Sequence, residues 1–313
     1  MSELPAGLTV RPPRPEDADA ILQLAVDYFM RLLGRPMVTR SDIVHALGTP
    51  TFDPERDGWL VLRGNDVAGF GFVLGGTRRF VQLSVVAPDP AIAGWLVSAG
   101  TERARELAAA NAHPEVSVEV NLFRADDVLR EVVSDRGYEF ATSYLQLRID
   151  HSGLLPVPEP PAGTAVRAGA FDDPARRAFH ALMTVAFEGQ GSAALPPYDE
   201  WLAAHERSTQ SDWSQLTTVE RDGVTLAAID CNRDFVETDN CGYVAGLGVS
   251  PEARGLGLAK YLLRHTFAVD AAAGLDGTML YVDTNNPTPA LGLYESVGMR
   301  TVEIADSWSR KLR

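Results

Sequence analysis

The pattern of apolar and polar positions along the chain occurs twice, with an offset of about 160 residues. Residues 8–29 (LTVRPPRPEDADAILQLAVDYF) and 164–187 (TAVRAGAFDDPARRAFHALMTVAF) each open with a short strand pattern that ends in Val-Arg. An acidic turn follows, and apolar residues then recur at the spacing of one helix face. The pattern therefore predicts the same strand and amphipathic helix at the start of each half.

The rest of each half repeats in the same order. In residues 58–76 and 215–234, apolar and polar residues alternate on either side of Gly-Asn-Asp or Asp-Gly. This pattern predicts a β-hairpin in each segment. Residues 83–107 and 244–268 each run from an apolar strand through a loop into a long helix. A further strand, a short helix and a final strand then close each half. We interpret the chain as a tandem duplication.

The element order decides the fold class. Antiparallel neighbours and a strand–helix–strand crossover occur in each half, which predicts a mixed α/β (α+β) fold with a twisted, mostly antiparallel sheet flanked by helices. Between the halves, residues 151–163 (HSGLLPVPEPPAG) contain four prolines and little to bury. This composition is typical of a stiff linker. We therefore expect domains at residues 1–150 and 164–313, joined by a linker at 151–163.

The composition of the chain indicates which classes of partner and which cellular compartment to expect. The formal net charge of −14 argues against a nucleic-acid or anionic-membrane partner. The two cysteines provide no disulfide framework, and the N-terminus lacks the features of a signal peptide. We expect a cytoplasmic protein. The histidines show no metal-ligand spacing, so no metal is expected.

The segment VSPEARGLGLAKYLL, from Val249 to Leu263, places glycines where a strand meets a helix. We expect a strand from Tyr243 to Val249, a loop, and a helix from Leu256 onward. Backbone N–H groups at a helix N-terminus bind anions, and glycine lets a ligand approach the backbone. An ordinary loop entering a helix is the alternative. The spacing is not that of a P-loop, and Lys260 excludes the dinucleotide-binding G-x-G-x-x-G pattern.

The same segment resembles the acyl-CoA-binding signature [QR]-x-x-G-x-[GA] of the GNAT superfamily of N-acetyltransferases. Arg254, Gly257 and Ala259 occupy its three specified positions. Leu247-Gly248-Val249 resembles the strand before the signature, and NNPTPALGLYESVGM resembles the C-terminal motif of the superfamily. The resemblance implies two tandem GNAT folds, acetyl-CoA as co-substrate, and a small-molecule or peptide amine as acceptor.

The resemblance also implies roles for individual residues. The strand backbone would bind the pantetheine arm, the loop and first helical turn would bind the pyrophosphate, and Tyr294 would protonate the leaving thiolate. The implied cofactor-binding residues are Leu247, Gly248, Val249, Arg254, Gly255, Leu256, Gly257, Leu258, Ala259, Lys260 and Asn286. Two of these roles have alternatives, because Tyr294 can instead be a core residue and Lys260 a solvated one.

The sequence does not identify a general base. Mycothiol synthases, which are also tandem GNAT proteins, have a glutamate on the strand before the loop, and Tyr243 stands at that position here. Mycothiol synthase activity is an alternative to acetylation of another amine, and this difference weakens that alternative. Asp230, Glu237 and Asp239 lie nearby in sequence, and Glu188 lies in the variable substrate region. Spacing alone does not distinguish among these carboxylates.

The N-terminal half lacks the residues of the signature. Ala91 and Ile92 stand where the loop has its arginine and first glycine, and only Gly94 remains. Val133 falls where Tyr294 stands in the second half. We therefore expect a degenerate N-terminal domain and an active C-terminal N-acetyltransferase domain. The alternative from another functional class is a non-catalytic acyl-CoA sensor or scaffold.

Overall fold

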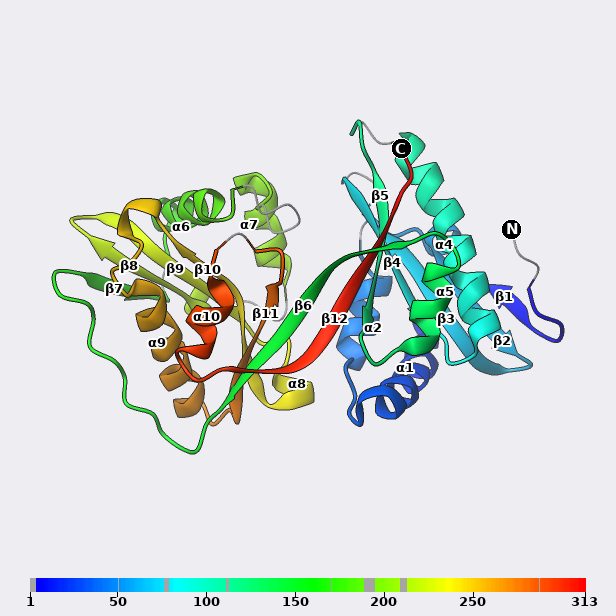
Figure 1. The fold of residues 1–313 in the computed structure, drawn as a ribbon, viewed down its shortest axis with the longest axis horizontal. Helices are drawn as coiled ribbons and strands as arrows, with labels where there is room; N and C mark the ends of the chain where they lie inside the picture. Colours follow the sequence, from blue (N-terminus) through cyan, green and yellow to red (C-terminus); the bar gives the residue numbers. More distant parts are fainter. Residues whose placement is uncertain are drawn as a thin grey trace. The chain divides into compact units, whose positions relative to one another are not determined.

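The computed structural model describes residues 4–49, 51–75, 79–110, 113–169, 171–188, 195–208, 213–286 and 288–313. The chain divides into two compact units, of which the first comprises residues 1–144 together with 304–313 and the second comprises residues 145–303. Figure 1 shows that each unit contains a sheet with helices beside it. No helix in the described part of the chain is both long and apolar enough to cross a bilayer.

The sheet of the first unit has the strand order β1-β2-β3-β4-β5-β12. Its neighbours pair antiparallel, except that β4 and β5 pair parallel. The strands are β1 (Thr9–Arg11), β2 (Gly58–Arg63), β3 (Asp66–Leu74), β4 (Phe80–Val86), β5 (Ser117–Phe123) and the end of β12 (Arg300–Lys311). The helices are α1 (Ala18–Leu33), α2 (Arg40–Leu47), α3 (Pro54–Asp57), α4 (Pro90–Ala110) and α5 (Asp127–Ser134).

The second unit repeats this plan with the strand order β6-β11-β10-β9-β8-β7. Here β10 and β11 form the parallel pair. The strands are the end of β6 (Glu139–Asp150), β7 (Ala165–Ala168), β8 (Leu216–Arg221), β9 (Val224–Asn232), β10 (Cys241–Val249) and β11 (Gly277–Asp283). The helices are α6 (Asp173–Ala186), α7 (Tyr198–Arg207), α8 (Val236–Asp239), α9 (Leu258–Ala272) and α10 (Ala290–Glu295). The predicted mixed, mostly antiparallel α/β fold is confirmed in both units.

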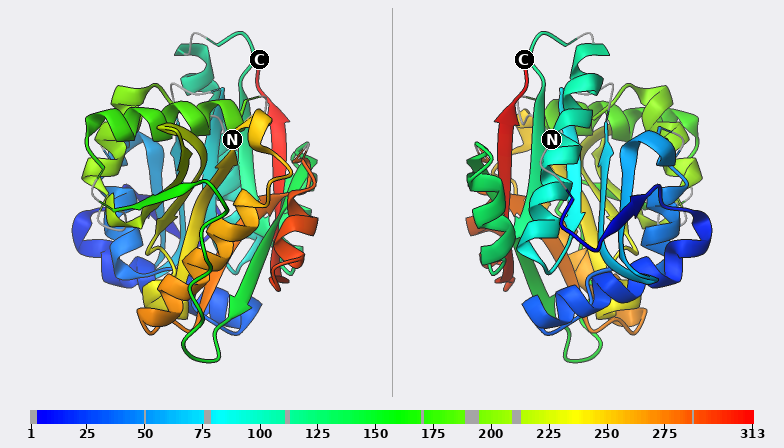
Figure 2. Two further views of the ribbon diagram at one scale, coloured as in Figure 1. Left: turned by 90° about the vertical axis from the view of Figure 1, so that its left-hand side faces the viewer. Right: turned by 90° about the vertical axis from the view of Figure 1, so that its right-hand side faces the viewer.

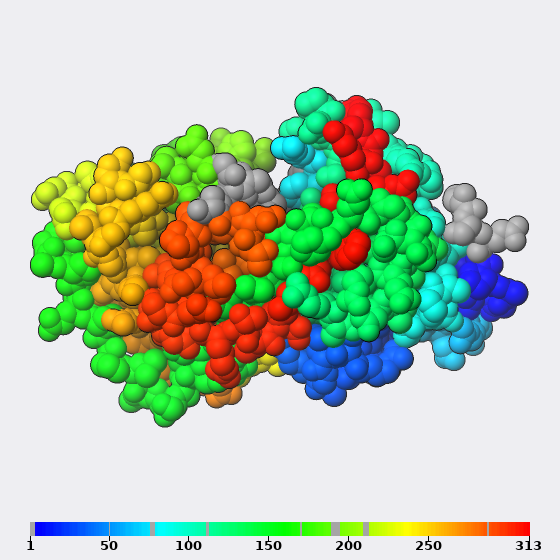
Figure 3. Space-filling view, viewed as in Figure 1, coloured from blue at the N-terminus to red at the C-terminus, as the bar shows by residue number. Residues whose placement is uncertain are grey.

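Helices cover both faces of the second sheet. Ala227 and Ile229 of β9 belong to the apolar cluster that includes residues of α9, whereas Ala228 belongs to the cluster formed with α6 and α7. Successive side chains of a strand point to opposite faces, so α9 and α6 lie on opposite sides of the sheet. The left panel of Figure 2 shows this arrangement. The short helix α10 has no buried residue and lies at the surface of the unit (Figure 3).

The hairpins form where the sequence predicts them. In the turn between β8 and β9, Asp222 and Gly223 have φ values of 52° and 77°. Two consecutive residues with positive φ are typical of a type I′ turn, whose twist matches that of the flanking strands. The Asp-Gly pair therefore fixes the register of the second hairpin.

The units divide the chain differently from the expected domains. Residues 145–150, at the end of β6, belong to the second unit, and residues 304–313 belong to the first. Each half thus contributes its last strand to the sheet formed by the other half. Residues 151–164 form no helix or strand, but Leu155 packs against the core of the second unit. In this division the segment expected as a linker is part of the second unit.

Candidate active site

The two parallel strands of the second unit separate halfway along their length. Among the described residues, β10 pairs with β11 only from Cys241 to Val244, opposite Gly277 to Leu280. On its other side β10 continues to pair with β9 as far as Val249. The backbone of residues 245–249 is therefore unpaired on the side of β11. Such a strand edge can hydrogen-bond an extended ligand in the way that it would bind another strand.

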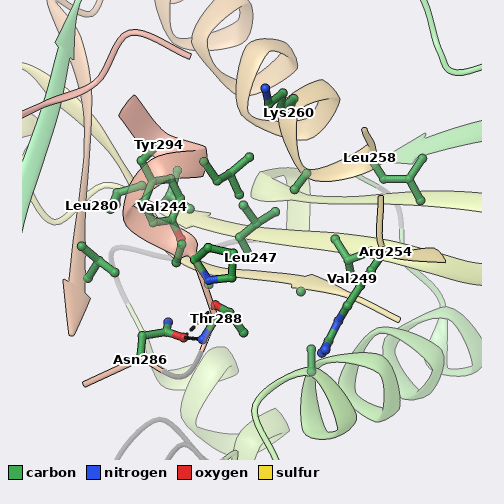
Figure 4. A pocket seen from close by; sticks show the side chains of 18 of the residues that line it. Val244, Leu247, Val249, Arg254, Leu258, Lys260, Leu280, Asn286, Thr288 and Tyr294 are labelled. Carbon is green, nitrogen blue, oxygen red and sulfur yellow. Dashed lines mark hydrogen bonds between the residues drawn. The ribbon is translucent and has the colours of Figure 1, made fainter. Parts of the chain in front are cut away.

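A cavity of about 550 Å³ lies between the separated strands (Figure 4). Residues of β10, the loop that follows it, the start of α9, β11 and α10 line this cavity. All but one of the residues assigned by resemblance line it, namely Leu247, Gly248, Val249, Arg254, Gly255, Gly257, Leu258, Ala259, Lys260, Asn286 and Tyr294. The exception is Leu256, whose side chain is 51% exposed. Ala186, Phe187, Tyr281 and Thr288 also line the cavity, and sequence reasoning did not identify them.

The glycine loop leaves the start of α9 accessible. Gly255 and Gly257 have φ values of 82° and 78°, and a Cβ built on either would meet no atom within 4 Å. The expectation that the helix begins at Leu256 is wrong, because Gly257 in the left-handed conformation delays the start to Leu258. Gly257 is the N-cap residue and has no side chain that could accept a hydrogen bond from the first turn.

The first turn of α9 therefore presents free hydrogen-bond donors to the cavity. Within the described part of the chain, the backbone N–H groups of Leu258, Ala259 and Lys260 have no acceptor. Free donors and the helix dipole favour an anion at this position. Arg254 and Lys260 also line the cavity and add positive charge. This end of the cavity fits a phosphate group.

Two glycines of β10 allow α6 to lie close to the strand. A Cβ built on Gly246 would lie 2.7 Å from the Met183 Cε, and one on Gly248 would lie 2.8 Å from the Met183 Sδ. A Cβ at Gly248 would also lie 2.9 Å from the Ala186 Cβ, so a larger residue there would disturb the wall that Ala186 and Phe187 form. The sequence signal for this close approach is a pair of glycines two positions apart, on one face of the strand.

Tyr294 and Asn286 line the cavity from α10 and from the loop after β11. Tyr294 projects from α10 toward Val244 and Leu280, and its ring packs against the apolar cluster that contains them (Figure 4). Burial raises the pKa of Tyr294 to about 12, so its hydroxyl is protonated at neutral pH and can donate a proton. The Asn286 Oδ1 accepts hydrogen bonds from the Thr288 backbone N–H at 2.9 Å and from its hydroxyl at 2.7 Å. These bonds hold Asn286 against Thr288, close to the start of α10.

The equivalent place in the first unit is closed. The helix α4 begins at Pro90, and the Asp89 Oδ1 accepts hydrogen bonds from the backbone N–H groups of Ala91 and Ile92, at 2.8 and 3.3 Å. A carboxylate of the chain itself thus occupies the helix N-terminus. A Cβ built on Gly94 would lie 2.3 Å from the Arg136 guanidinium, which fills the space beside this glycine.

Comparison with known families agrees with this geometry. Residues 177–299 match the sequence model of the acetyltransferase (GNAT) family. This matched segment, which lies within the second unit, is similar to a GNAT domain. Enzymes of this family use acetyl-CoA, and a bare helix N-terminus beside separated parallel strands suits its pyrophosphate and pantetheine groups.

Known proteins resemble the chain beyond this segment. Over 315 residues the chain is 28% identical to a mycothiol acetyltransferase from Streptomyces coelicolor, covering 94% of this chain and 96% of the relative. A match to the protein of the same name from Salinispora arenicola is 35% identical over 179 residues and covers 52% of this chain and 53% of the relative. The chain thus spans about half the length of the first curated relatives that it matches.

Two solved structures match the fold over nearly the full length of the chain. A GCN5-related N-acetyltransferase from Sphaerobacter thermophilus matches with a TM-score of 0.84 at 22% identity, covering 99% of this chain and 98% of the other. A tandem GNAT protein from the clavulanic acid biosynthesis pathway matches with a TM-score of 0.70 at 15% identity, covering 98% and 99%. The tandem GNAT fold that the resemblance implies is therefore confirmed.

Proposed function

We propose that this chain transfers the acetyl group of acetyl-CoA to a primary amine of a small molecule or peptide. The observation that supports this proposal most strongly is the cavity itself. It is lined both by the first turn of α9, with its free N–H groups, and by Tyr294. The first unit has an internal carboxylate at the equivalent helix N-terminus, which supports one active site per chain.

Different residues of the second unit would perform different steps of this reaction. The first turn of α9 and Arg254 would hold the pyrophosphate. The free edge of β10 would hydrogen-bond the pantetheine arm, and an N–H group near Val249 would polarise the thioester carbonyl. The protonated Tyr294 would donate a proton to the departing thiolate. Direct attack by the amine in a ternary complex needs no covalent intermediate on the protein.

A second candidate is acetylation of the cysteinyl pseudodisaccharide that precedes mycothiol. The observation that favours it is the alignment with the Streptomyces coelicolor mycothiol acetyltransferase over 96% of that protein. Tyr243 counts against it, since it stands where mycothiol synthases have a glutamate. The acceptor would then need a different base from the one that the mycothiol synthases use.

Incubation of the full chain with acetyl-CoA and a panel of amines tests the proposal. The panel contains polyamines, amino sugars, peptides and the mycothiol precursor, and mass spectrometry detects the acetylated product. We expect one panel member to be acetylated catalytically. Acetylation confined to the mycothiol precursor would select the second candidate. Tight acetyl-CoA binding without turnover on any amine would refute the enzymatic function and favour a sensor.

A further inference from the structure

Asp230 lies on the strand next to the cavity, on the face that α6 covers. Its neighbour Ala228, two positions earlier on β9, belongs to the cluster formed with α6 and α7, so Asp230 shares that face. Its register partners are Gly246 on β10 and Leu216 on β8. Gly246 opposes Asp230 just beyond the irregularity that begins at Val244, where β10 also stops pairing with β11.

The distance from Asp230 to the cavity wall is short. A Cβ built on Gly246 would lie 3.9 Å from the Asp230 Cβ and 3.9 Å from the Phe187 Cε2. Gly246 and Phe187 both line the cavity. Gly246 has no side chain, and the atom nearest to the position of its missing Cβ is the terminal methyl of Met183, at 2.7 Å. The end of this flexible side chain is the closest group above Gly246 on the face that Asp230 shares.

The Asp230 carboxyl lacks the partners that partly buried carboxyls usually have. No hydrogen bond or ion pair to it occurs among the residues that the structure describes, and the residue is only partly exposed. Burial raises the pKa of Asp230 to about 7, and the negative charge of Asp234 raises it further. A desolvated carboxyl without a partner costs stability, and such groups concentrate at functional sites.

Among the described residues, the groups around Asp230 include no cation. From β10, Tyr243 interacts with it electrostatically, and from the opposite face of β9 Cys231 does so. Asp234 follows on the same chain segment and accepts a hydrogen bond from Asn232 at 2.9 Å. The residues of α6 at this position, Met183 and Phe187, carry no charge. Nothing described near Asp230 therefore neutralises its ionised form.

We propose that Asp230 is the general base that deprotonates the acceptor amine. The proposal rests on the function proposed above. It assigns the general base, which is otherwise unassigned because Tyr243 stands where mycothiol synthases have a glutamate on β10. Tyr243 is a poor base, since burial raises its pKa well above neutral and keeps its hydroxyl protonated. Asp230 places a carboxyl on the adjacent strand, on the same face of the sheet as Tyr243.

The proton balance of the step is complete. An ammonium acceptor loses one proton to the Asp230 carboxylate, and the resulting neutral amine forms the C–N bond at the thioester carbonyl carbon. The C–S bond breaks, and the second nitrogen proton reaches the departing sulfur by way of Tyr294. Asp230 then returns its proton to solvent. The net products are the amide, the free thiol and one proton.

Asp230→Asn tests the proposal, with Asp222→Asn as the matched control. Asp222 lies in the turn of the same hairpin, so both variants remove one negative charge, and asparagine tolerates the φ of 52° at position 222. We expect Asp230→Asn to lower kcat by about 10²–10⁴-fold while calorimetry shows unchanged acetyl-CoA affinity. Wild type and Asp222→Asn should both show kcat/KM rising through pH 7 with the same amine, and Asp230→Asn should lose that rise.

The outcomes separate this proposal from the proposed function. Wild-type turnover together with Asp230→Asn turnover within a few-fold, and the same pH dependence, would overturn the role of Asp230 alone. Absence of wild-type turnover on every amine would overturn the proposed function and this inference with it. If Asp230→Asn fails to bind acetyl-CoA, Asp230→Ala with added formate decides the matter. Recovery of turnover by formate supports a missing base, and no recovery in a variant that binds acetyl-CoA refutes it.

Discussion

The glycine at the start of α9 allows a paired test of the anion site. Gly257 and Gly274 flank the same helix, with φ values of 78° and 81°, and a Cβ built on either would meet no atom within 4 Å. Alanine at either position should therefore destabilise the fold by a similar amount, about 1–2 kcal/mol, from the left-handed backbone alone. Only Gly257 lines the cavity. Any difference in acetyl-CoA affinity between the two variants then reports the anion site.

The expected loss of affinity follows from the hydrogen bonds at stake. A hydrogen bond to a charged group contributes about 1.5–3 kcal/mol, so displacing the pyrophosphate from one N–H group should raise Kd by about 10–150-fold. Calorimetry on Gly257→Ala and Gly274→Ala measures Kd, and urea unfolding measures the destabilisation. We expect weak binding only for Gly257→Ala. Equal Kd values in the two variants would refute the assignment of the first turn of α9 to the pyrophosphate.

Three further predictions follow from the same structure. Tyr294→Phe should lower turnover by about 10²–10⁴-fold with unchanged acetyl-CoA affinity, and unchanged turnover would return Tyr294 to a core role. Calorimetry should find one acetyl-CoA per chain, because Asp89 occupies the helix N-terminus of the first unit, and two equal sites would contradict this. Asp230→Asn should raise the stability of the protein at pH 8 by up to about 4 kcal/mol and much less at pH 4, measured by urea unfolding. The sign follows because the raised pKa of Asp230, about 7, means that its contribution to stability is lost as pH rises through this value.

Local sequence signals point to much of the cavity lining because many of the lining residues are close together in the sequence. The strand edge, the glycine loop and the first helical turn lie within residues 244–260, and the spacing of Arg254, Gly257 and Ala259 identifies them. The start of α9 was misplaced by two residues because helix periodicity contains no information on the backbone conformation of Gly257. Only the observed φ shows that this glycine precedes the helix.

The properties of Asp230 depend on tertiary packing and were not accessible from the sequence. Its neighbours in the chain, Ile229 and Cys231, face the α9 side of the sheet, so local context does not show what surrounds the carboxyl. Asp230 lies on the face of the sheet that α6 approaches closely, because Gly246 and Gly248 have no side chains. The positions of Asp230 and Glu237 in the sequence give no reason to prefer one of them as a base. In the structure, burial raises the pKa of Asp230.

The exchange of final strands makes part of the first repeat a strand of the sheet that lines the cavity. The sequence pattern of β6 is that of any last strand in its own half, and it does not state which neighbour the strand pairs with. In the structure the end of β6 pairs with β11, and Leu147 is fully buried in the core of the second unit. Gln146 donates a hydrogen bond from Nε2 to the Tyr281 hydroxyl at 2.9 Å, and Tyr281 lines the cavity. The first repeat, whose own helix N-terminus is closed, thus supplies a strand that positions a wall of the cavity in the second.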